Sequence, residues 1–200
     1  INSNPKIVYY FRDEGQKGIE RKFQFPVLFK TCGVEAKALL DLLFIDHNNK
    51  KVYPVDLKTT GKRVEDFNKS FVSFRYYLQA AYYSEAVRQW MQLQTMIGAH
   101  DYSEYSIEPF QFAVLSKKGY GVPMIFQVTE NDLNCGREGG VIPGIGYRRG
   151  YVQLIEDLNW HKANNYWDSS RELFESSHTV KLNVFEENDN RESRAEAISG

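Results

Sequence analysis

The chain has 200 residues, of which 42% are hydrophobic and 14% are aromatic, and its formal net charge is −1. This composition is typical of a folded domain with a sizeable core, and it excludes an intrinsically disordered chain. No apolar run approaches the roughly 20 residues that span a bilayer, so we expect no membrane partner.

Only two cysteines are present, Cys32 and Cys135, and they are far apart in the sequence. This spacing argues against a zinc or iron–sulfur site held by cysteines of this chain. A single disulfide stays open, but a reduced, cytoplasmic compartment is the simpler interpretation. The missing initiator methionine suggests a trimmed chain or a fragment.

The first third of the chain predicts strands. Residues 7–11 and 19–30 are rich in aromatic and β-branched side chains, and glycines punctuate the gap between them. Residues 34–46 and 52–58 are two further β-like runs, separated by the polar turn 47–51, and together they predict a hairpin. We therefore expect two extended segments followed by a hairpin.

A long helix is predicted next. The polar connection 59–69 leads into a stretch from about residue 71 to residue 96, where apolar side chains recur with a period close to 3.6. Gly98 and the polar run 100–106 end this pattern. The helix therefore follows the predicted hairpin directly and can pack across it.

The second half of the chain predicts two more strands and a second helix. The strands are residues 107–116 and 122–128, around the turn 117–121. The glycine-rich stretch 134–150 predicts a loop, and residues 150–176 carry the apolar spacing of a helix.

This order of elements predicts an α/β or α+β fold in which helices flank a central mixed sheet. We expect a single domain over residues 1–185. Residues 186–200 are polar and charged, so we expect them to form a mobile tail.

Two aspartates and a lysine in the predicted hairpin carry the chemistry. Asp56 and Lys58 are two residues apart, so in a strand both side chains point to one face. Asp41 lies in the preceding run, and the hairpin brings it near Asp56. Two neighbouring carboxylates repel each other, a divalent cation relieves that repulsion, and carboxylate oxygens favour magnesium or manganese over zinc. Alone, Asp56 and Lys58 are also compatible with an ordinary surface ion pair.

The sequence around the hairpin is locally basic. Residues 50–75 contain seven basic and three acidic side chains, a net charge of +4, which suits a phosphate-backbone ligand. A solvated, lysine-rich turn is the alternative. The basic residues are Lys50, Lys51, Lys58, Lys62, Arg63, Lys69 and Arg75.

Gln79 and Tyr83 lie four residues apart on the predicted helix after the hairpin, so their side chains are neighbours on one helical face. A helix packed across the sheet could aim both polar tips at the predicted metal site. Taken alone, the same spacing is better explained by a core helix whose tyrosine packs by its ring.

The ordered set Asp41, Asp56-Leu57-Lys58 and Gln79-x-x-x-Tyr83 resembles the PD-(D/E)XK nuclease superfamily. It is closest to the RecB-like and phage-type exonucleases that carry a QxxxY motif after the catalytic lysine. The resemblance covers roughly residues 34–90. It implies a restriction-endonuclease-like αβββαβ core, a metal bound by Asp41, Asp56 and the carbonyl of Leu57, a catalytic Lys58, and substrate-side roles for Gln79 and Tyr83.

Two departures from the family pattern concern the acidic residues. Leu40 precedes Asp41, so the first motif has no Pro-Asp pair. Relatives often place a Glu or His on a helix upstream of the first strand, and residues 1–18 do not predict such a helix. Glu20 and Glu35 are the candidates for that role within this chain, and the alternative is an element that lies before its first residue.

The leading hypothesis is a deoxyribonuclease that uses Mg²⁺, with Mn²⁺ able to substitute. It would act as an exonuclease on DNA in phage or bacterial recombination and repair. Family relatives pass the resected strand to a single-strand annealing protein, and some form homo-oligomeric rings. The alternatives are a structure-specific endonuclease and a catalytically silent nuclease fold that binds DNA or protein.

Overall fold

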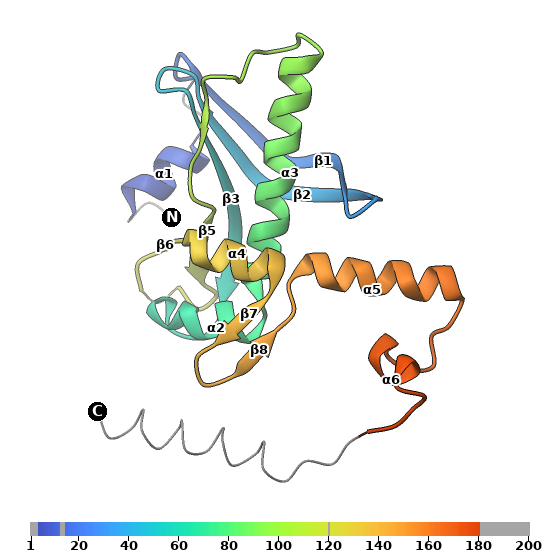
Figure 1. Cartoon of the computed structure of the whole chain (residues 1–200). Helices are drawn as coiled ribbons and strands as arrows, with labels where there is room; N and C mark the ends of the chain where they lie inside the picture. Colours follow the sequence, from blue (N-terminus) through green and yellow to red (C-terminus); the bar gives the residue numbers. More distant parts are fainter. Residues whose placement is uncertain (1–3, 13–14, 120, 181–200) are drawn as a thin grey trace.

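The structure is a computed structural model that describes residues 4–12, 15–119 and 121–180. Its centre is a mixed β-sheet with the strand order β1-β2-β3-β5-β6, in which β4 also pairs with β3 (Figure 1). The predicted α+β class, with helices flanking a central mixed sheet, is confirmed. The strands are β1 (Ile19–Thr31), β2 (Val34–Asp46), β3 (Lys51–Thr60), β4 (Ser106–Ile107), β5 (Gln111–Ser116) and β6 (Met124–Gln127), and a separate hairpin consists of β7 (Gly140–Ile142) and β8 (Gly146–Arg148). The helices are α1 (Pro5–Phe11), the short 3₁₀ helix η1 (Val64–Asp66), α2 (Phe67–Ser73), α3 (Tyr76–Met96), α4 (Glu130–Glu138), α5 (Tyr151–Asn164) and α6 (Arg171–Glu175).

The pairing of the first three strands creates a fork in the sheet. β1 and β2 form a long antiparallel hairpin that was not predicted, whereas the predicted hairpin of residues 34–46 and 52–58 is confirmed as β2 and β3. β2 pairs with β3 only as far as Leu42 opposite Val55, and the two strands separate beyond that pair. β3 continues in parallel with β5 as far as Thr60. The diverging strands therefore leave open the space beside Asp41 of β2 and Leu57 of β3, which we call the fork.

The two faces of the sheet are covered by different helices. On one face, α3 packs over β1, β2 and β5 through two apolar clusters. On the other face, α1 places the buried side chains Ile7 and Tyr10 against Leu42, Phe44 and neighbouring strand residues. The α1 cluster ends at Leu42 and Val55, so on that face the fork itself is partly exposed, and 39% of the Leu57 surface is accessible.

The prediction that residues 7–11 are extended is wrong, because they belong to helix α1. The Asn4 side chain accepts hydrogen bonds from the backbone N–H groups of Lys6 and Ile7, and Pro5 occupies the first helical position. These start signals and the burial of Ile7 and Tyr10 on one helical face outweigh the local β preference of the aromatic run. An upstream helix therefore exists, contrary to the sequence prediction.

The predicted helix at 71–96 is two helices. α2 ends at Ser73 and α3 starts at Tyr76. Between them Arg75 has a left-handed backbone, with φ 55° and ψ 41°. The sequence predicted one helix because no glycine or proline marks this break and the apolar period of 3.6 residues continues across it.

Three predictions in the second half are corrected in detail. The strand predicted at 107–116 is split into β4 and β5, and Pro109 lies in the interruption. The helix predicted at 150–176 is α5 followed by the short α6. The loop predicted at 134–150 instead contains the C-terminal part of α4, which ends at the C-cap Gly139, and the β7–β8 hairpin. The predicted tail at 186–200 lies outside the described residues.

Gly136 allows α4 to lie close against α3. An added Cβ at this position would lie 2.2 Å from the backbone oxygen of Tyr77. We expect Gly136→Ala to lower the free energy of unfolding by about 1–3 kcal/mol, because a backbone atom cannot move aside as a flexible side chain would. Gly61→Ala is the matched control, since an added Cβ there meets nothing within 4 Å. Urea denaturation checks this, and equal stability of the two variants would contradict it.

Two further findings bear on the sequence predictions. Cys32 and Cys135 are both free thiols. Within the described residues, no helix is both long enough and apolar enough to cross a membrane.

Candidate active site

Asp41 occupies the fork and is held from both sides. Its Oδ2 accepts a hydrogen bond of 2.8 Å from the backbone N–H of Leu57, which would otherwise face the gap between β2 and β3. Its Oδ1 accepts a hydrogen bond of 2.8 Å from Nε2 of Gln24 on β1. Gln24 has a left-handed backbone, with φ 45°, at the point where the β1–β2 pairing skips a residue. The Asp41 carboxylate therefore bridges three strands.

Asp56 is buried in the middle of β3, with 3% of its surface exposed. Its Oδ1 accepts a hydrogen bond of 2.7 Å from Nε2 of Gln79 on α3. Its Oδ2 lies 2.6 Å from Nζ of Lys58 in an ion pair that lacks hydrogen-bond geometry. Burial raises the pKa of Asp56 above its ordinary range, and the nearby Asp41 adds to this rise, while Lys58 and Gln79 oppose it.

Lys58 points to the α3 face of the sheet, the same face as Asp56, as their spacing of two residues predicts. Its Nζ lies 4.8 Å from the ring centre of Tyr76 and 5.8 Å from that of Phe112. Aromatic faces attract an ammonium group, so these rings hold the lysine beside Asp56. Tyr76 was not singled out from the sequence.

Gln79 reaches the site, whereas Tyr83 does not bond to it. The Tyr83 ring packs edge-on against Phe110, with 6.3 Å between ring centres, and it borders both apolar clusters on the α3 face. Among the described residues, no hydrogen bond is formed by its hydroxyl. A substrate role for Tyr83 therefore stays a prediction, and its contacts are those of a packing residue.

The two weak candidates for a third acid lie elsewhere. Glu20 pairs with Lys22 and His47 at the start of β1, opposite Ile45 and away from Asp41. Glu35 is exposed next to the β1–β2 turn, opposite Lys30. Helix α1, which spans Pro5–Phe11, contains neither Glu nor His. The part of the chain that the structure describes therefore supplies two carboxylates at the fork.

These residues fit a hard divalent cation. Each of the four carboxylate oxygens of Asp41 and Asp56 already lies near a donor group. A carboxylate oxygen can accept more than one bond, so a cation can still bind there. Oδ2 of Asp56 in particular is buried beside Lys58 without forming a hydrogen bond. An extended residue directs its N–H and C=O to the same side, so the Leu57 carbonyl also faces the fork. Mg²⁺ commonly takes one or two carboxylates and completes its shell with water. No cluster of three or more His, Cys, Asp or Glu side chains that could hold a metal occurs among the described residues.

The raised pKa of Asp56 predicts a pH dependence of stability in the metal-free protein. A carboxyl group with a higher pKa in the folded state holds its proton more tightly there than in the unfolded chain. The free energy of unfolding should therefore fall as the pH rises from the ordinary value of 3.8 to the raised value, and this contribution should be constant above it. Asp56→Asn removes the titration.

Urea denaturation in EDTA, repeated across pH for wild type and Asp56→Asn, measures this contribution directly. We expect the stability of the wild type relative to the variant to decrease with rising pH in that window. An increase with pH, or a difference that does not change with pH, would contradict the burial argument.

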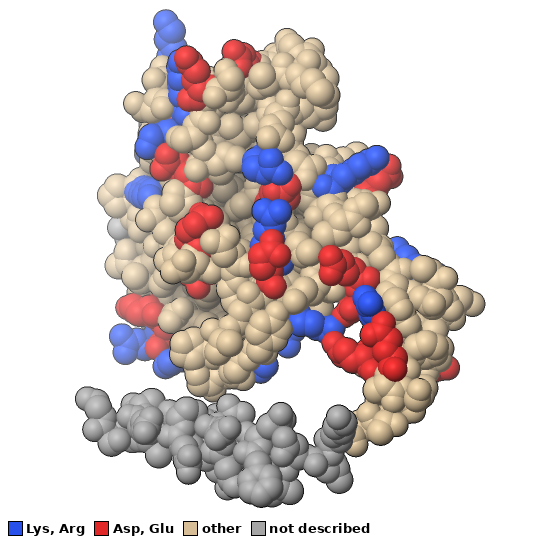
Figure 2. All heavy atoms as spheres, viewed as in Figure 1, with Lys and Arg blue, Asp and Glu red and all other residues tan. Residues whose placement is uncertain are grey.

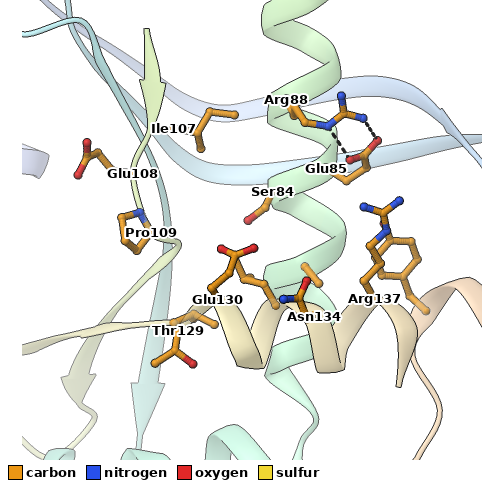
Figure 3. Close-up of a pocket in the computed structure, with 14 residues that line it drawn as sticks. Ser84, Glu85, Arg88, Ile107, Glu108, Pro109, Thr129, Glu130, Asn134 and Arg137 are labelled. Atoms are coloured by element: carbon orange, nitrogen blue, oxygen red, sulfur yellow. Dashed lines mark hydrogen bonds and ion pairs between the residues drawn. The ribbon is translucent and has the colours of Figure 1, made fainter. Parts of the chain in front are cut away.

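A cavity of about 410 Å³ lies between α3, α4 and the segment that joins β4 to β5 (Figure 3). None of the predicted site residues lines it. Its charges have mixed signs, and Arg88 is already paired with Glu85 across one turn of α3, as the dashed lines in Figure 3 show. The carboxylate pair is found at the fork rather than in this cavity.

Ion pairing neutralises most of the basic stretch at residues 50–75. On the face shown in Figure 2, basic and acidic side chains are interspersed. Among the described residues, Lys62 and Arg75 are the two basic side chains of the stretch that form no ion pair. The five that do are paired as Lys50–Glu104, Lys51–Glu108, Lys58–Asp56, Arg63–Glu65 and Lys69–Asp66.

Neither a family model nor a curated protein sequence matches this chain. Among solved structures, the chain is similar to a crystal structure from Eubacterium rectale described as a "putative exonuclease", with 17% sequence identity and a TM-score of 0.43. The similarity covers 89% of this chain and 60% of that protein, so the chain spans three fifths of its length. A likeness at this TM-score transfers neither an activity nor site residues, and the functional argument rests on the fork itself.

Proposed function

We propose that the chain is a metal-dependent deoxyribonuclease of the PD-(D/E)XK type that hydrolyses DNA phosphodiester bonds. The observation that carries this proposal is the buried Asp56, which lies 2.6 Å from Lys58 and beside the fork that holds Asp41. A buried carboxylate is costly unless its charge is used or compensated, and perturbed groups of this kind concentrate at functional sites.

The proposed division of labour follows from the contacts. Asp41, Asp56 and the Leu57 carbonyl would hold Mg²⁺, or Mn²⁺ in its place. The cation would neutralise charge on the phosphate and lower the pKa of attacking water. Lys58 would orient that water or stabilise the developing negative charge, since its ammonium is fixed at the same face. Gln79 would keep the Asp56 carboxylate in position through its hydrogen bond.

Within this class we propose an exonuclease of phage or bacterial recombination and repair, because the chain has the QxxxY spacing of that branch and Gln79 donates a hydrogen bond to Asp56. The same proposal includes a single-strand annealing protein as a partner and self-assembly of the chain into homo-oligomers. A structure-specific endonuclease is the nearest alternative with the same site. The lack of a third acid near the fork, within the described residues, favours a second candidate, a silent nuclease fold that binds DNA or protein.

The test is cleavage of linear duplex DNA in Mg²⁺, with EDTA as the control. We expect progressive shortening of linear DNA and little attack on closed circular DNA. Cleavage of both substrates would favour the endonuclease. The absence of any metal-dependent cleavage, with DNA binding retained, would instead favour the silent module.

A further inference from the structure

The break between α2 and α3 presents an aromatic ring to solvent beside the candidate active site. Phe74 follows the last residue of α2, and 67% of its surface is exposed, although it is a large apolar side chain. Its ring contacts Tyr76, with 5.6 Å between the ring centres. Tyr76 in turn stacks on Phe67, 5.7 Å away and only 17° from parallel. The partly buried Tyr76, backed by the buried Phe67, thus supports one side of Phe74, while most of the Phe74 surface is exposed.

Arg75, the next residue, adds a positive charge to the same break. It is exposed and forms no ion pair or side-chain hydrogen bond within the described part of the chain. Its left-handed backbone is disfavoured for a long side chain, yet it lies between two regular helices. This conformation lets Phe74 leave the path of α2 and Tyr76 start α3.

The Phe74–Arg75 break, as we call it, is connected to Lys58 by direct contacts. The Phe74 ring lies 5.6 Å from the Tyr76 ring, and that ring lies 4.8 Å from Nζ of Lys58. The Phe74 ring is therefore at most 10.4 Å from the lysine that pairs with Asp56. Stacked nucleotides along one strand are spaced by about 3.4 Å, so this distance corresponds to about three nucleotides.

We infer that the Phe74–Arg75 break is a binding site for a single DNA strand, with a base stacked on Phe74 and a backbone phosphate on Arg75. This inference rests on the proposed nuclease function and adds a substrate subsite to it. Every nucleobase has a π-face, so stacking on an exposed ring holds a strand regardless of its sequence. The unpaired guanidinium supplies the charge that a phosphate requires.

Binding in EDTA tests this site without cleavage. The probes are a fluorescein-labelled oligothymidylate and the same oligomer with abasic positions, measured by fluorescence anisotropy. We expect Phe74→Ala to weaken binding of the normal oligomer roughly 5- to 150-fold, the range for loss of one stacked base, and to affect the abasic oligomer far less. Phe74→Tyr should retain binding, because its ring stacks equally well.

Trp167→Ala is the matched control, since Trp167 is an aromatic residue that is 57% exposed and lies beyond α5, outside the candidate site. We expect this variant to bind as wild type does. Wild-type binding of both oligomers by Phe74→Ala would overturn the stacking subsite. If wild type still cleaved DNA in Mg²⁺ in that case, the proposed function would stand. If wild type neither bound nor cleaved DNA, both would fall.

A second variant tests the charge independently of Phe74. Arg75→Gly removes the guanidinium but suits the left-handed backbone, so its thermal stability should equal or exceed that of wild type. We expect the plot of log Kobs against log salt for the normal oligomer to become shallower by about 0.7, the value for one phosphate contact on a single strand. Arg75→Lys should keep the wild-type slope. An unchanged slope in Arg75→Gly would overturn the phosphate contact.

Discussion

Replacing Lys58 with alanine is expected to lower metal-dependent DNA cleavage by a factor of about 100 to 1,000. The ammonium group lies 2.6 Å from Asp56, where charge would develop on the phosphate, so its removal takes away stabilisation of the transition state. DNA binding should change much less, because the Lys58 ammonium is already paired with Asp56 in the free protein. The variant should be somewhat less stable than wild type, since the buried Asp56 loses its cation.

Lys51→Ala is the control for the loss of a lysine from the same strand. Lys51 lies at the start of β3 and pairs with Glu108, away from the fork. Its replacement should leave the cleavage rate within about twofold of wild type, because a surface ion pair contributes little. Rates measured on linear duplex DNA in Mg²⁺ compare the three proteins. Wild-type cleavage by Lys58→Ala would remove this residue from the catalytic machinery.

Asp41→Asn is expected to weaken Mn²⁺ binding strongly, because it changes a proposed metal ligand. The change of an outer-shell partner alone typically weakens metal binding about 10- to 100-fold, and we expect a larger loss here. The amide has nearly the same shape and can still accept a hydrogen bond from the Leu57 N–H, and its NH2 group can donate to Oε1 of Gln24 once that side-chain amide turns over, so the fork should keep its geometry. What it lacks is the negative charge that a hard cation requires. The fold should therefore be retained while the metal affinity falls.

Glu35→Gln is the matched control for Asp41→Asn. Both acids lie on β2, but Glu35 is exposed beside the β1–β2 turn and far from Asp56 in the pairing register. Isothermal titration with MnCl₂ should give the wild-type affinity for this variant. If Glu35→Gln weakened binding as much as Asp41→Asn, the metal would not be held at the fork. The same result would return Glu35 to consideration as a ligand.

The sequence predicted the part of the fold that carries the site, because the periods of its elements are clear. Strand alternation placed Asp56 and Lys58 on one face, and the helical period placed Gln79 on a helix that crosses that face. The hydrogen bond from Gln79 to Asp56 and the ion pair from Lys58 both follow from this arrangement. The fork itself was not predicted, since no local signal shows where β2 and β3 separate.

The errors came from tertiary contacts that outweigh local preference. The aromatic run of α1 has a β-like composition, but its capping residue and its buried face select a helix. The break at Arg75 contains no residue that usually ends a helix, so nothing in the pattern marked it. Gly136 was taken as part of a loop, whereas it belongs to a helix that requires a small residue against Tyr77.

Two contacts at the site have no sequence signal. Gln24 holds Asp41 from a neighbouring strand, and its role depends on the skipped pair in the β1–β2 register. Tyr76 lies over the ammonium of Lys58, at a position where an aromatic residue normally packs. Both residues were identified only from the register and the distances of the folded chain.

The most direct test of the account is a crystal of the full chain soaked in MnCl₂ and measured at the manganese absorption edge. A metal site at the fork predicts an anomalous peak between Asp41 and Asp56, about 2.0–2.3 Å from a carboxylate oxygen of each, with the Leu57 carbonyl turned towards it. It also predicts that the peak is lost in Asp41→Asn. Strong anomalous density elsewhere, with the fork empty and Lys58 still paired to Asp56, would contradict a metal-dependent nuclease at this site.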